Sequence, residues 1–397
     1  MKLLLVADSF PPMNSSSAIQ LNDLCKEFTN QHHDIHVVFP SPFTQKHLEI
    51  DASNTFPIMK IKVPDLRSGG MIRRALVELS LSFILILKFR KTSWADLKFD
   101  GVIWYSPSIF LGLFAWYIKY KNNCKGYLIL RDIFPDWALD VGILKKNVIY
   151  YVFKMFERFQ YNVATVIGIQ TPGNIKYFEA NSILKNKVEV LCNWLTPPQK
   201  PYPDLDFKIE NSKLSGRQIF VYAGNIGPAQ NVEGIVQIAE QLSSNDSIGF
   251  LVVGRGSQME RVQNLITRKD LPNILIMDEV ESKFIPALYE QCSCGIVSLN
   301  SDHKSHNIPG KFVSYIHNAL PVFAILNQGN DLAEIIDAEK IGKATFQTAP
   351  ITLANELSEF CSLLTTNEEE MRQNCKSLSQ EMFSSTIAAK QITKALF

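Results

Sequence analysis

Apolar residues in the first half of the chain form short continuous runs, separated by longer stretches in which they recur at helical spacing. Such runs, without strict alternation, are typical of strands buried on both faces of a parallel sheet. We expect these strands at residues 2–7, 35–39, 101–105, 126–130, 165–170 and 188–191. Helices are expected between them at residues 18–29, 108–120 and 148–163. The pattern therefore predicts an α/β unit.

The same rhythm restarts after residues 196–216, a polar, proline-rich stretch that is the best linker candidate in the chain. Strands are expected beyond it at residues 218–223, 249–253, 274–277, 295–299 and 322–326. The helices between them are expected at residues 232–242, 258–268, 284–291 and 311–319. We therefore predict two Rossmann-like domains whose parallel sheets face a cleft, at residues 1–195 and 217–375. A C-terminal helix at residues 376–397 is expected to pack back on the first domain.

Two segments of the first half depart from this rhythm. Residues 40–70 contain several prolines and are expected to be irregular. Residues 75–87, ALVELSLSFILIL, contain a single charged residue, Glu78, and have basic residues on both flanks. A segment of 13 residues is too short to span a bilayer. It is either a helix of the core or a helix that lies in a membrane interface.

The composition narrows the class of protein. With 46% hydrophobic residues, 20% charged residues and a formal net charge of +1, the 397-residue chain has a soluble globular balance that does not favour nucleic acid. Its seven cysteines are scattered, so a reducing cytoplasm is expected rather than a disulfide framework. Cys292 and Cys294 lack the further ligands of a zinc site and are expected in the core. Asp8 and the Pro11-Pro12 pair interrupt the apolar N-terminus, which indicates a strand rather than a signal peptide.

Two loops of the first half place polar groups at strand ends, where open α/β sheets bind ligands. Asn14 and the serines at 15–17 follow the first strand, and they either approach a phosphate or sugar or cap the next helix. Arg131, Asp132 and Asp136 follow the strand at residues 126–130. These three either bind hydroxyl groups or a cation, or the two aspartates simply begin the next helix.

Three loops of the second half should meet, because strand-end loops of one parallel sheet converge on one edge. They are Gly224-Asn225-Ile226-Gly227, Gly254-Arg255-Gly256 and Pro309-Gly310-Lys311. Lys311 at a helix start can bind an anion together with the helix dipole, although a solvated lysine on an ordinary helix gives the same pattern. The dinucleotide-binding fingerprint is incomplete, and the sequence has neither a P-loop nor a hydrolase elbow. The Asp-Leu-Asp at residues 204–206 lies in the expected linker and is discounted as a metal site.

Six segments, in this order and spacing, resemble the retaining GT-B glycosyltransferases that use nucleotide-sugars. They are residues 10–17, RDIFPDW, GIQTPGNIKYF, VYAGNIGPAQN, FLVVGRGSQ and PGKFVSYIHNALPV. The resemblance spans nearly the whole chain and points to the bacterial O-antigen and capsule branch, the fucosaminyltransferase-like proteins. It implies a GT-B fold with an N-terminal acceptor domain and a C-terminal nucleotide-sugar domain.

The sequence also departs from this family at four positions. The family places an arginine and a lysine on the donor diphosphate, where this chain has Asn225 and Gln230. It places two glutamates on the donor sugar and ribose, where this chain has His306 and Ser314. Lys311 is thus the remaining cation for the diphosphate. The absent glutamates are consistent with a 6-deoxy amino sugar such as N-acetylfucosamine in the donor.

The resemblance implies a site with three groups of residues. Asp132 and Lys311 are the expected catalytic residues. The expected donor-binding residues are Ser15, Ser16, Gly224, Asn225, Gln230, Asn231, Gly254, His306, Pro309, Gly310, Lys311, Phe312 and Ser314. The expected acceptor-binding residues are Asn14, Arg131 and Asp136. No metal ion or other cofactor is implied.

The activity implied by the resemblance is sugar transfer, with retention, from a UDP-sugar to a lipid-linked saccharide in the synthesis of lipopolysaccharide O-antigen or capsule. The enzyme is expected in the cytoplasm, peripherally associated with the inner membrane, with no nucleic-acid partner. Two other classes stay open: a UDP-sugar epimerase of GT-B fold, and a non-catalytic relative that binds a sugar nucleotide.

Overall fold

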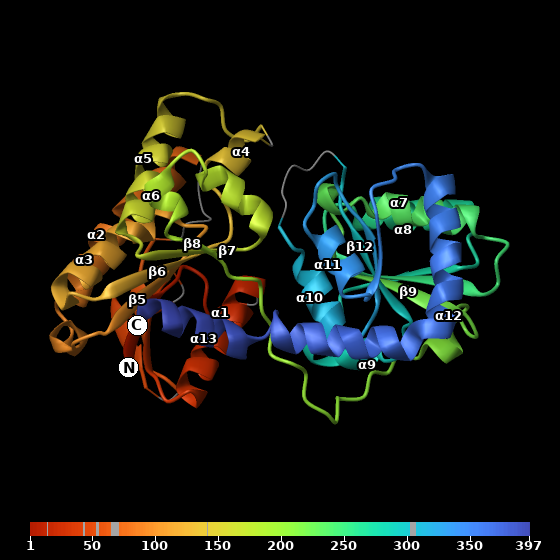
Figure 1. The fold of residues 1–397 in the computed structure, drawn as a ribbon, viewed down its shortest axis with the longest axis horizontal. Helices are drawn as coiled ribbons and strands as arrows, with labels where there is room; N and C mark the ends of the chain where they lie inside the picture. The colour runs from red at the N-terminus through yellow and green to blue at the C-terminus, as the bar shows by residue number, and fades with distance from the viewer. Residues whose placement is uncertain (14, 43, 53–54, 65–70, 141, 302–306) are drawn as a thin grey trace. The chain divides into compact units, whose positions relative to one another are not determined.

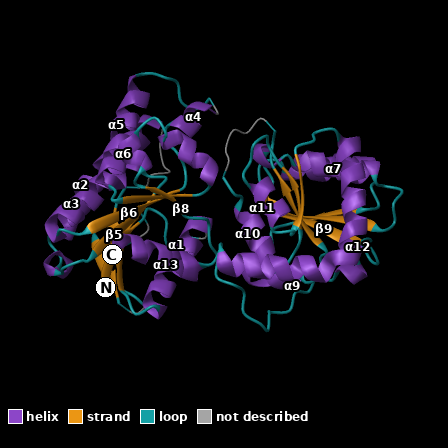
Figure 2. Ribbon diagram, in the orientation of Figure 1, coloured by secondary structure: helices purple, strands orange, loops and turns teal. Residues whose placement is uncertain are grey.

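The structure, a computed structural model, describes residues 1–13, 15–42, 44–52, 55–64, 71–140, 142–301 and 307–397. The chain forms two compact units (Figure 1). Unit 1 consists of Met1–Cys192 and Ser385–Phe397, and unit 2 consists of Asn193–Ser384. Each unit contains its own sheet with helices on both faces, as Figure 2 shows.

The sheet of unit 1 has the strand order β3-β4-β2-β1-β5-β6-β7-β8, and every neighbouring pair is parallel except β3 with β4. Its strands are β1 (Lys2–Val6), β2 (Asp34–Ser41), β3 (Leu48–Asp51), β4 (Ile58–Lys62), β5 (Gly101–Tyr105), β6 (Lys125–Leu130), β7 (Val166–Ile169) and β8 (Val188–Val190). The central strands are apolar on both faces, as expected for a sheet that is covered on both sides.

Two groups of helices cover the faces of this sheet. The helices of unit 1 are α1 (Ser16–Asn30), α2 (Met71–Phe89), α3 (Gly112–Asn122), α4 (Asp136–Asp140), α5 (Val148–Val163), α6 (Ser182–Lys185) and α13 (Ser385–Leu396). Short 3-10 turns lie at η1 (Ser93–Asp96), η2 (Ile109–Leu111) and η3 (Pro172–Phe178). Helices α2, α3 and α5 pack in sequence with one another, and α1 packs against α13. Leu4 and Val6 lie in the core under α2 and α3, whereas Leu3 lies near Leu396 of α13 on the other face.

The sheet of unit 2 has six parallel strands in the order β11-β10-β9-β12-β13-β14. Its strands are β9 (Gln218–Asn225), β10 (Ile248–Arg255), β11 (Ile274–Met277), β12 (Cys294–Ser298), β13 (Val322–Ile325) and β14 (Gly342–Thr345). Its helices are α7 (Val232–Gln241), α8 (Met259–Lys269), α9 (Ile285–Tyr289), α10 (Gly310–His317), α11 (Leu332–Ala338) and α12 (Pro350–Glu381). Its 3-10 turns are η4 (Ile209–Asn211), η5 (Pro228–Gln230) and η6 (Ser282–Phe284).

Most predicted elements are present, and three expectations need correction. Residues 40–70 are not wholly irregular, because they contain β3 and β4. The single C-terminal helix expected at residues 376–397 is instead two helices. Helix α12 begins much earlier, at Pro350, and α13 begins at Ser385. Residues 196–216, expected to be a linker, lie within unit 2. Cys292 and Cys294 are buried, which confirms their place in the core.

Candidate functional site

The strand order of unit 2 reverses between β9 and β12, so the connections after these two strands leave toward opposite faces of the sheet. Open α/β sheets bind ligands in the crevice that such a reversal leaves at the carboxyl ends of the strands. The loop after β9 contains Gly224 and Asn225, and the connection after β12 leads into α10. The predicted glycine loops and Lys311 therefore belong to the reversal point of this sheet.

The glycine loops after β9 and β10 pack backbone against backbone. Gly254 pairs with Gly224, and a Cβ atom at Gly254 would lie 1.9 Å from the carbonyl oxygen of Gly224. A Cβ atom at Gly256 would lie 2.2 Å from the carbonyl oxygen of Ile226. A Cβ atom at Gly224 would lie 3.7 Å from Cε of Lys311. The three loops therefore meet, as the sequence predicts, and only glycine fits at two of these positions.

The side chain of Lys311 places a buried ammonium group at this edge of the sheet. Its Nζ lies 3.7 Å from the centroid of the Tyr222 ring, a cation–π contact. No hydrogen-bond acceptor for this Nζ exists among the residues that the structure describes. Burial without a counter-charge lowers the pKa of Lys311 to about 7. An anion placed beside this ammonium group would remove the cost of burying it unpaired.

The start of α10 adds backbone donors to this cation. Pro309 is the N-cap residue, and no side chain caps the first turn of the helix. A Cβ atom at Gly310 would meet nothing within 4 Å, which leaves the approach to these N–H groups open. The ring of Phe312 is fully buried against Phe383, so its contribution to donor binding is limited to its backbone. The Ser314 side chain lies within hydrogen-bonding reach of the buried Tyr289.

The two positions at which the family has cations hold neutral amides that bind each other. Asn225 Nδ2 donates to Gln230 Oε1 at 2.9 Å, on the exposed side of the loop. Asn231 follows as the N-cap of α7, with φ of 45° and without a side-chain cap hydrogen bond. His306 and Asn14 lie outside the described residues.

Tyr315 lies at the reversal point and connects its two strands. Its buried hydroxyl accepts a hydrogen bond from the Ala223 N–H at 3.1 Å. It also lies 3.2 Å from the carbonyl oxygen of Val221 and 3.1 Å from that of Ile296. This hydroxyl thus joins β9 to β12 beneath the glycine loops. The only signal in the sequence is that a buried tyrosine needs polar partners.

A separate pocket of about 400 Å³ lies at the reversal point of unit 1, between β1 and β5. It combines three carboxylates with apolar and aromatic walls. Its lining includes Asp8, Glu78, Pro107, Ser108, Ile109, Phe110, Asp132, Phe134, Trp137, Ala138, Ile143, Leu144 and Phe153. Carboxylates that accept from hydroxyl groups, together with aromatic rings, suit a sugar better than they suit a phosphate.

Asp132 is the sequence-predicted residue that lines this pocket. Burial raises its pKa, and the neighbouring guanidinium group of Arg131 opposes that rise. Glu78, the single charged residue of the apolar segment at residues 75–87, lines the same pocket from α2, which the sequence alone does not indicate. The pocket therefore gathers residues from α2, from the loop after β1 and from the segment after β6.

The other predicted residues of unit 1 make internal contacts. Arg131 is buried, and its Nη1 donates to the carbonyl oxygen of Leu191 at 2.9 Å. Asp136 accepts from the Tyr150 hydroxyl at 2.6 Å and from Lys154 Nζ at 3.1 Å.

The serine loop likewise forms a helix cap. Ser15 is the N-cap of α1, and its Oγ accepts from the Ala18 N–H at 3.2 Å. It also shares a hydroxyl network with Ser9 and Ser17. Ser16 is exposed at the first turn of the helix. Of the two interpretations of this loop, the structure shows the helix cap.

Comparison with known sequences matches both halves of the chain to glycosyltransferases. Residues 205–381 match the family described as glycosyl transferases group 1. A Pseudomonas aeruginosa protein named as a glycosyltransferase, WbjE, is 24% identical over 318 residues, which cover 76% of this chain and 75% of that protein. An Escherichia coli (strain K12) protein named for glycosyl transfer in colanic acid biosynthesis, WcaI, is 22% identical over 227 residues, 55% of each chain.

Comparison with solved structures supports the fold of the whole chain. The structure of Alr3699/HepE from Anabaena in complex with UDP superposes with a TM-score of 0.68 at 13% identity. The match covers 100% of this chain and 99% of that protein. At this identity the likeness bears on the fold alone.

Proposed function

We propose that this chain, which has the GT-B fold, is a retaining group 1 glycosyltransferase that transfers a sugar from a UDP-sugar to a lipid-linked saccharide. The relatives named for glycosyl transfer, one of them in colanic acid biosynthesis, support a role in bacterial surface polysaccharide synthesis. We place the enzyme in the pathway of an O-antigen or a capsule, in the cytoplasm and at the inner membrane. Among the described residues, no helix has both the length and the apolarity to cross a membrane.

The buried ammonium group of Lys311 is the observation that carries this proposal. It lies beside Gly224, at the reversal point of a parallel sheet, without a hydrogen-bond acceptor among the described residues. The diphosphate of a UDP-sugar supplies the missing counter-charge, and backbone N–H groups at the start of α10 supply further donors. A structural neighbour with this fold binds UDP.

Lys311 and these N–H groups would stabilise the leaving group during transfer. In a retaining reaction of this type the bond from the anomeric carbon to the diphosphate oxygen breaks, and the acceptor hydroxyl attacks from the same face. The proton of that hydroxyl passes to the leaving diphosphate, so the reaction requires no protein nucleophile. Charge grows on the diphosphate as the bond breaks, and pre-placed donors stabilise that charge most strongly.

Unit 1 would hold the acceptor in the pocket that contains Asp132. The carboxylate of Asp132 would accept from the reacting or a neighbouring hydroxyl group, while the aromatic walls cover the sugar ring. The neutral Asn225–Gln230 pair and the absent glutamates favour a donor sugar that needs few charged contacts, such as N-acetylfucosamine.

The test is incubation of the purified protein with a panel of UDP-sugars and a prenyl-diphosphate-linked saccharide. We expect release of UDP together with a mass gain on the acceptor, and the anomeric configuration of the donor retained in the product. Release of UDP without acceptor modification would indicate hydrolysis or epimerisation. Binding of UDP-sugars without release would indicate a non-catalytic relative.

A further inference from the structure

The pocket of unit 1 contains a buried hydroxyl group that has no partner among the described residues. It belongs to Ser108, which follows β5 and is the N-cap residue of η2, yet caps no N–H group of that turn with its side chain. Ser108 lines the pocket, and it is only 9% exposed. Its Oγ finds no hydrogen bond within the described part of the chain. A buried hydroxyl group costs free energy unless a hydrogen bond replaces its contact with water, so a ligand in the pocket would stabilise it.

Three carboxylates line the same pocket, and none of the described lining residues is basic. Asp8 and Asp132 come from the segments after β1 and β6, and Glu78 comes from α2. Burial, helped by the charges of Asp132 and Asp8, raises the pKa of Tyr105 to about 12, although the charge of Arg131 opposes the rise. The two aspartates therefore lie near the end of β5, to which Tyr105 belongs.

The rest of the pocket wall is a chain of aromatic rings. The ring centroid of Phe153 lies 6.1 Å from that of Phe110 and 5.2 Å from that of Phe134. Phe134 in turn lies 6.4 Å from Trp137, which is 42% exposed. A sugar ring has apolar C–H faces and polar hydroxyl edges. A wall of aromatic rings with a few polar groups matches both.

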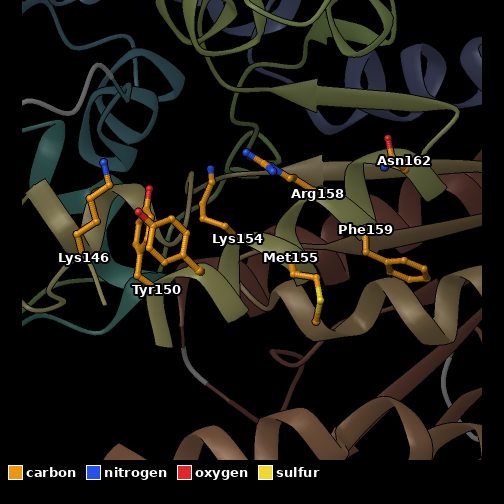
Figure 3. Close-up of a pocket in the computed structure, with 8 residues that line it drawn as sticks. Lys146, Tyr150, Lys154, Met155, Arg158, Phe159 and Asn162 are labelled. Carbon is orange, nitrogen blue, oxygen red and sulfur yellow. The ribbon is translucent and has the colours of Figure 1, made fainter. Parts of the chain in front are cut away.

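Basic side chains of the same region line a different surface. Lys146, Lys154 and Arg158 belong to α5 or to the residues just before it, and they line a separate groove. Figure 3 shows their charged ends pointing to the same side of that groove. Lys154 is paired there with Asp136 at 3.1 Å. To the pocket, α5 contributes the ring of Phe153 and none of these three cations.

We propose that this pocket selects a neutral saccharide as the acceptor, with Ser108 and Glu78 as specificity-determining residues. The inference rests on the proposed function and names the class of its acceptor. The Ser108 hydroxyl group binds a hydroxyl group of the acceptor sugar, which supplies its missing partner. A sugar that carries a carboxylate, such as a hexuronic acid, meets three like charges and is repelled. Of these carboxylates, Glu78 can be removed without changing Asp132, the expected catalytic residue.

The test measures the binding of saccharide pairs to the full chain by saturation-transfer NMR, with UDP present throughout as the proposed ligand of unit 2. Each pair consists of the methyl glycoside of glucose, galactose or N-acetylglucosamine and its hexuronic acid counterpart, so its two members differ only at C6. The variants are Glu78→Gln and Ser108→Ala. One control is Glu179→Gln, an exposed glutamate of unit 1. The other is Ser106→Ala, whose hydroxyl group is also buried without a described partner but does not line the pocket.

We expect the wild type and both controls to bind at least one neutral glycoside about tenfold more tightly than its hexuronic acid counterpart. Glu78→Gln should reduce this preference to about threefold, because it removes one of the repelling charges. Ser108→Ala should weaken binding of the neutral glycoside about fivefold, because one hydrogen bond is lost. Thermal unfolding of each sample verifies that the variants are folded.

Equal affinity for the two members of every pair in the wild type would overturn the proposal, as would a failure to bind any neutral glycoside. A variant that behaves like its control would overturn the role assigned to that residue. UDP release is measured in parallel, with a UDP-sugar and prenyl-diphosphate-linked saccharides that end in the same sugars. Equally efficient transfer to neutral and acidic acceptors defeats this inference alone. Selective saccharide binding without any UDP release defeats the proposed function and leaves the selectivity of the pocket in place.

Discussion

The two units of this chain share a doubly wound parallel sheet, yet the reversal points of the two sheets offer opposite chemistry. In unit 2 the carboxyl edge presents glycine backbone and the buried cation of Lys311. In unit 1 the corresponding edge presents carboxylates, among them Asp132, and aromatic walls. The fold fixes where a ligand binds, and the side chains at that place decide whether it is a phosphate or a sugar.

The two units also differ in the number of apolar side chains that they expose. Among the described residues, 19 large apolar side chains are exposed, and 15 of them belong to unit 1. The four in unit 2 are Phe346, Ile351, Leu363 and Met382. A soluble nucleotide-sugar requires no apolar surface, whereas a lipid-linked acceptor does, so this asymmetry agrees with the proposed division of donor and acceptor between the units.

Replacement of Lys311 by methionine is expected to lower turnover more than any other change described below. Loss of a donor to the developing charge should lower turnover about 10²–10³-fold. The measurement is UDP release with the acceptor present. Lys343→Met, an exposed lysine of β14, is the control and should leave turnover unchanged. Near-normal turnover in Lys311→Met would remove the proposed role of this residue.

Replacement of Asp132 by asparagine tests the role of the carboxylate pocket in unit 1. In the proposed mechanism the carboxylate positions the acceptor, so transfer is expected to fall about 10²-fold, while UDP still binds to unit 2 at its wild-type affinity. The exposed Asp96→Asn variant serves as control. A parallel loss of UDP affinity would indicate that Asp132 has a structural role and that the two units are not separable in this way.

The structure also predicts that Lys154 matters for stability more than an exposed lysine does. Lys154→Met would leave Asp136 and the buried Glu157 without their cation and lower the free energy of unfolding of unit 1 by about 2–3 kcal/mol. Lys200→Met, which breaks an exposed pair with Glu290, should not change the denaturation midpoint measurably. Equal midpoints for the two variants would contradict the importance assigned to the buried network.

The smallest expected effect concerns the pH dependence of UDP affinity. Lys311 has a pKa of about 7 when no anion is bound, below its ordinary value of 10.5, because the group is buried. A bound diphosphate favours the protonated form, so binding takes up a proton above pH 7. Affinity should be highest below pH 7 and fall by up to about tenfold per pH unit above it. Calorimetry in buffers of different ionisation enthalpy measures this uptake, and its absence at pH 8 would contradict the assignment.

The lowered pKa of Lys311 also predicts that the stability of the folded protein changes with pH. Because the folded-state pKa lies below the unfolded-state value, the wild type carries the cost of a buried charge in full below pH 7. That cost disappears as the pH rises from 7 to 10.5. Lys311→Met should therefore be more stable than the wild type at pH 6, with a difference that shrinks toward pH 10. Thermal unfolding at these two pH values provides the measurement.

The sequence predicts the buried elements well, because their apolar runs or periodicities are unambiguous. Strand β5, strand β11 and helix α5 have the expected bounds. The edge strand β3 and its neighbour β4 were missed because charged residues such as Glu49 and Lys60 interrupt their apolar pattern, as is common near sheet edges. The start of α12 was missed although Leu353, Leu357, Phe360 and Leu364 form a buried stripe, since the surrounding residues are polar.

The site was predictable only in part. The convergence of Gly224, Gly254 and Lys311 follows from the geometry of parallel sheets. The burial of Lys311 over Tyr222 depends on tertiary packing, and no local pattern shows it. Polar residues at a strand end either bind ligands or make internal contacts, and the sequence alone does not distinguish Asp132, in a pocket, from Asp136, in an internal network.

A titration with UDP tests our proposal that unit 2 binds the donor diphosphate through Lys311. Binding is measured for the wild type, for Lys311→Met and for Lys343→Met at pH 6.5, with thermal unfolding of each sample to verify folding. We expect the wild type and Lys343→Met to bind UDP equally well, and Lys311→Met to lose at least about tenfold in affinity while remaining folded. Equal UDP affinity in all three proteins would show that Lys311 does not bind the diphosphate.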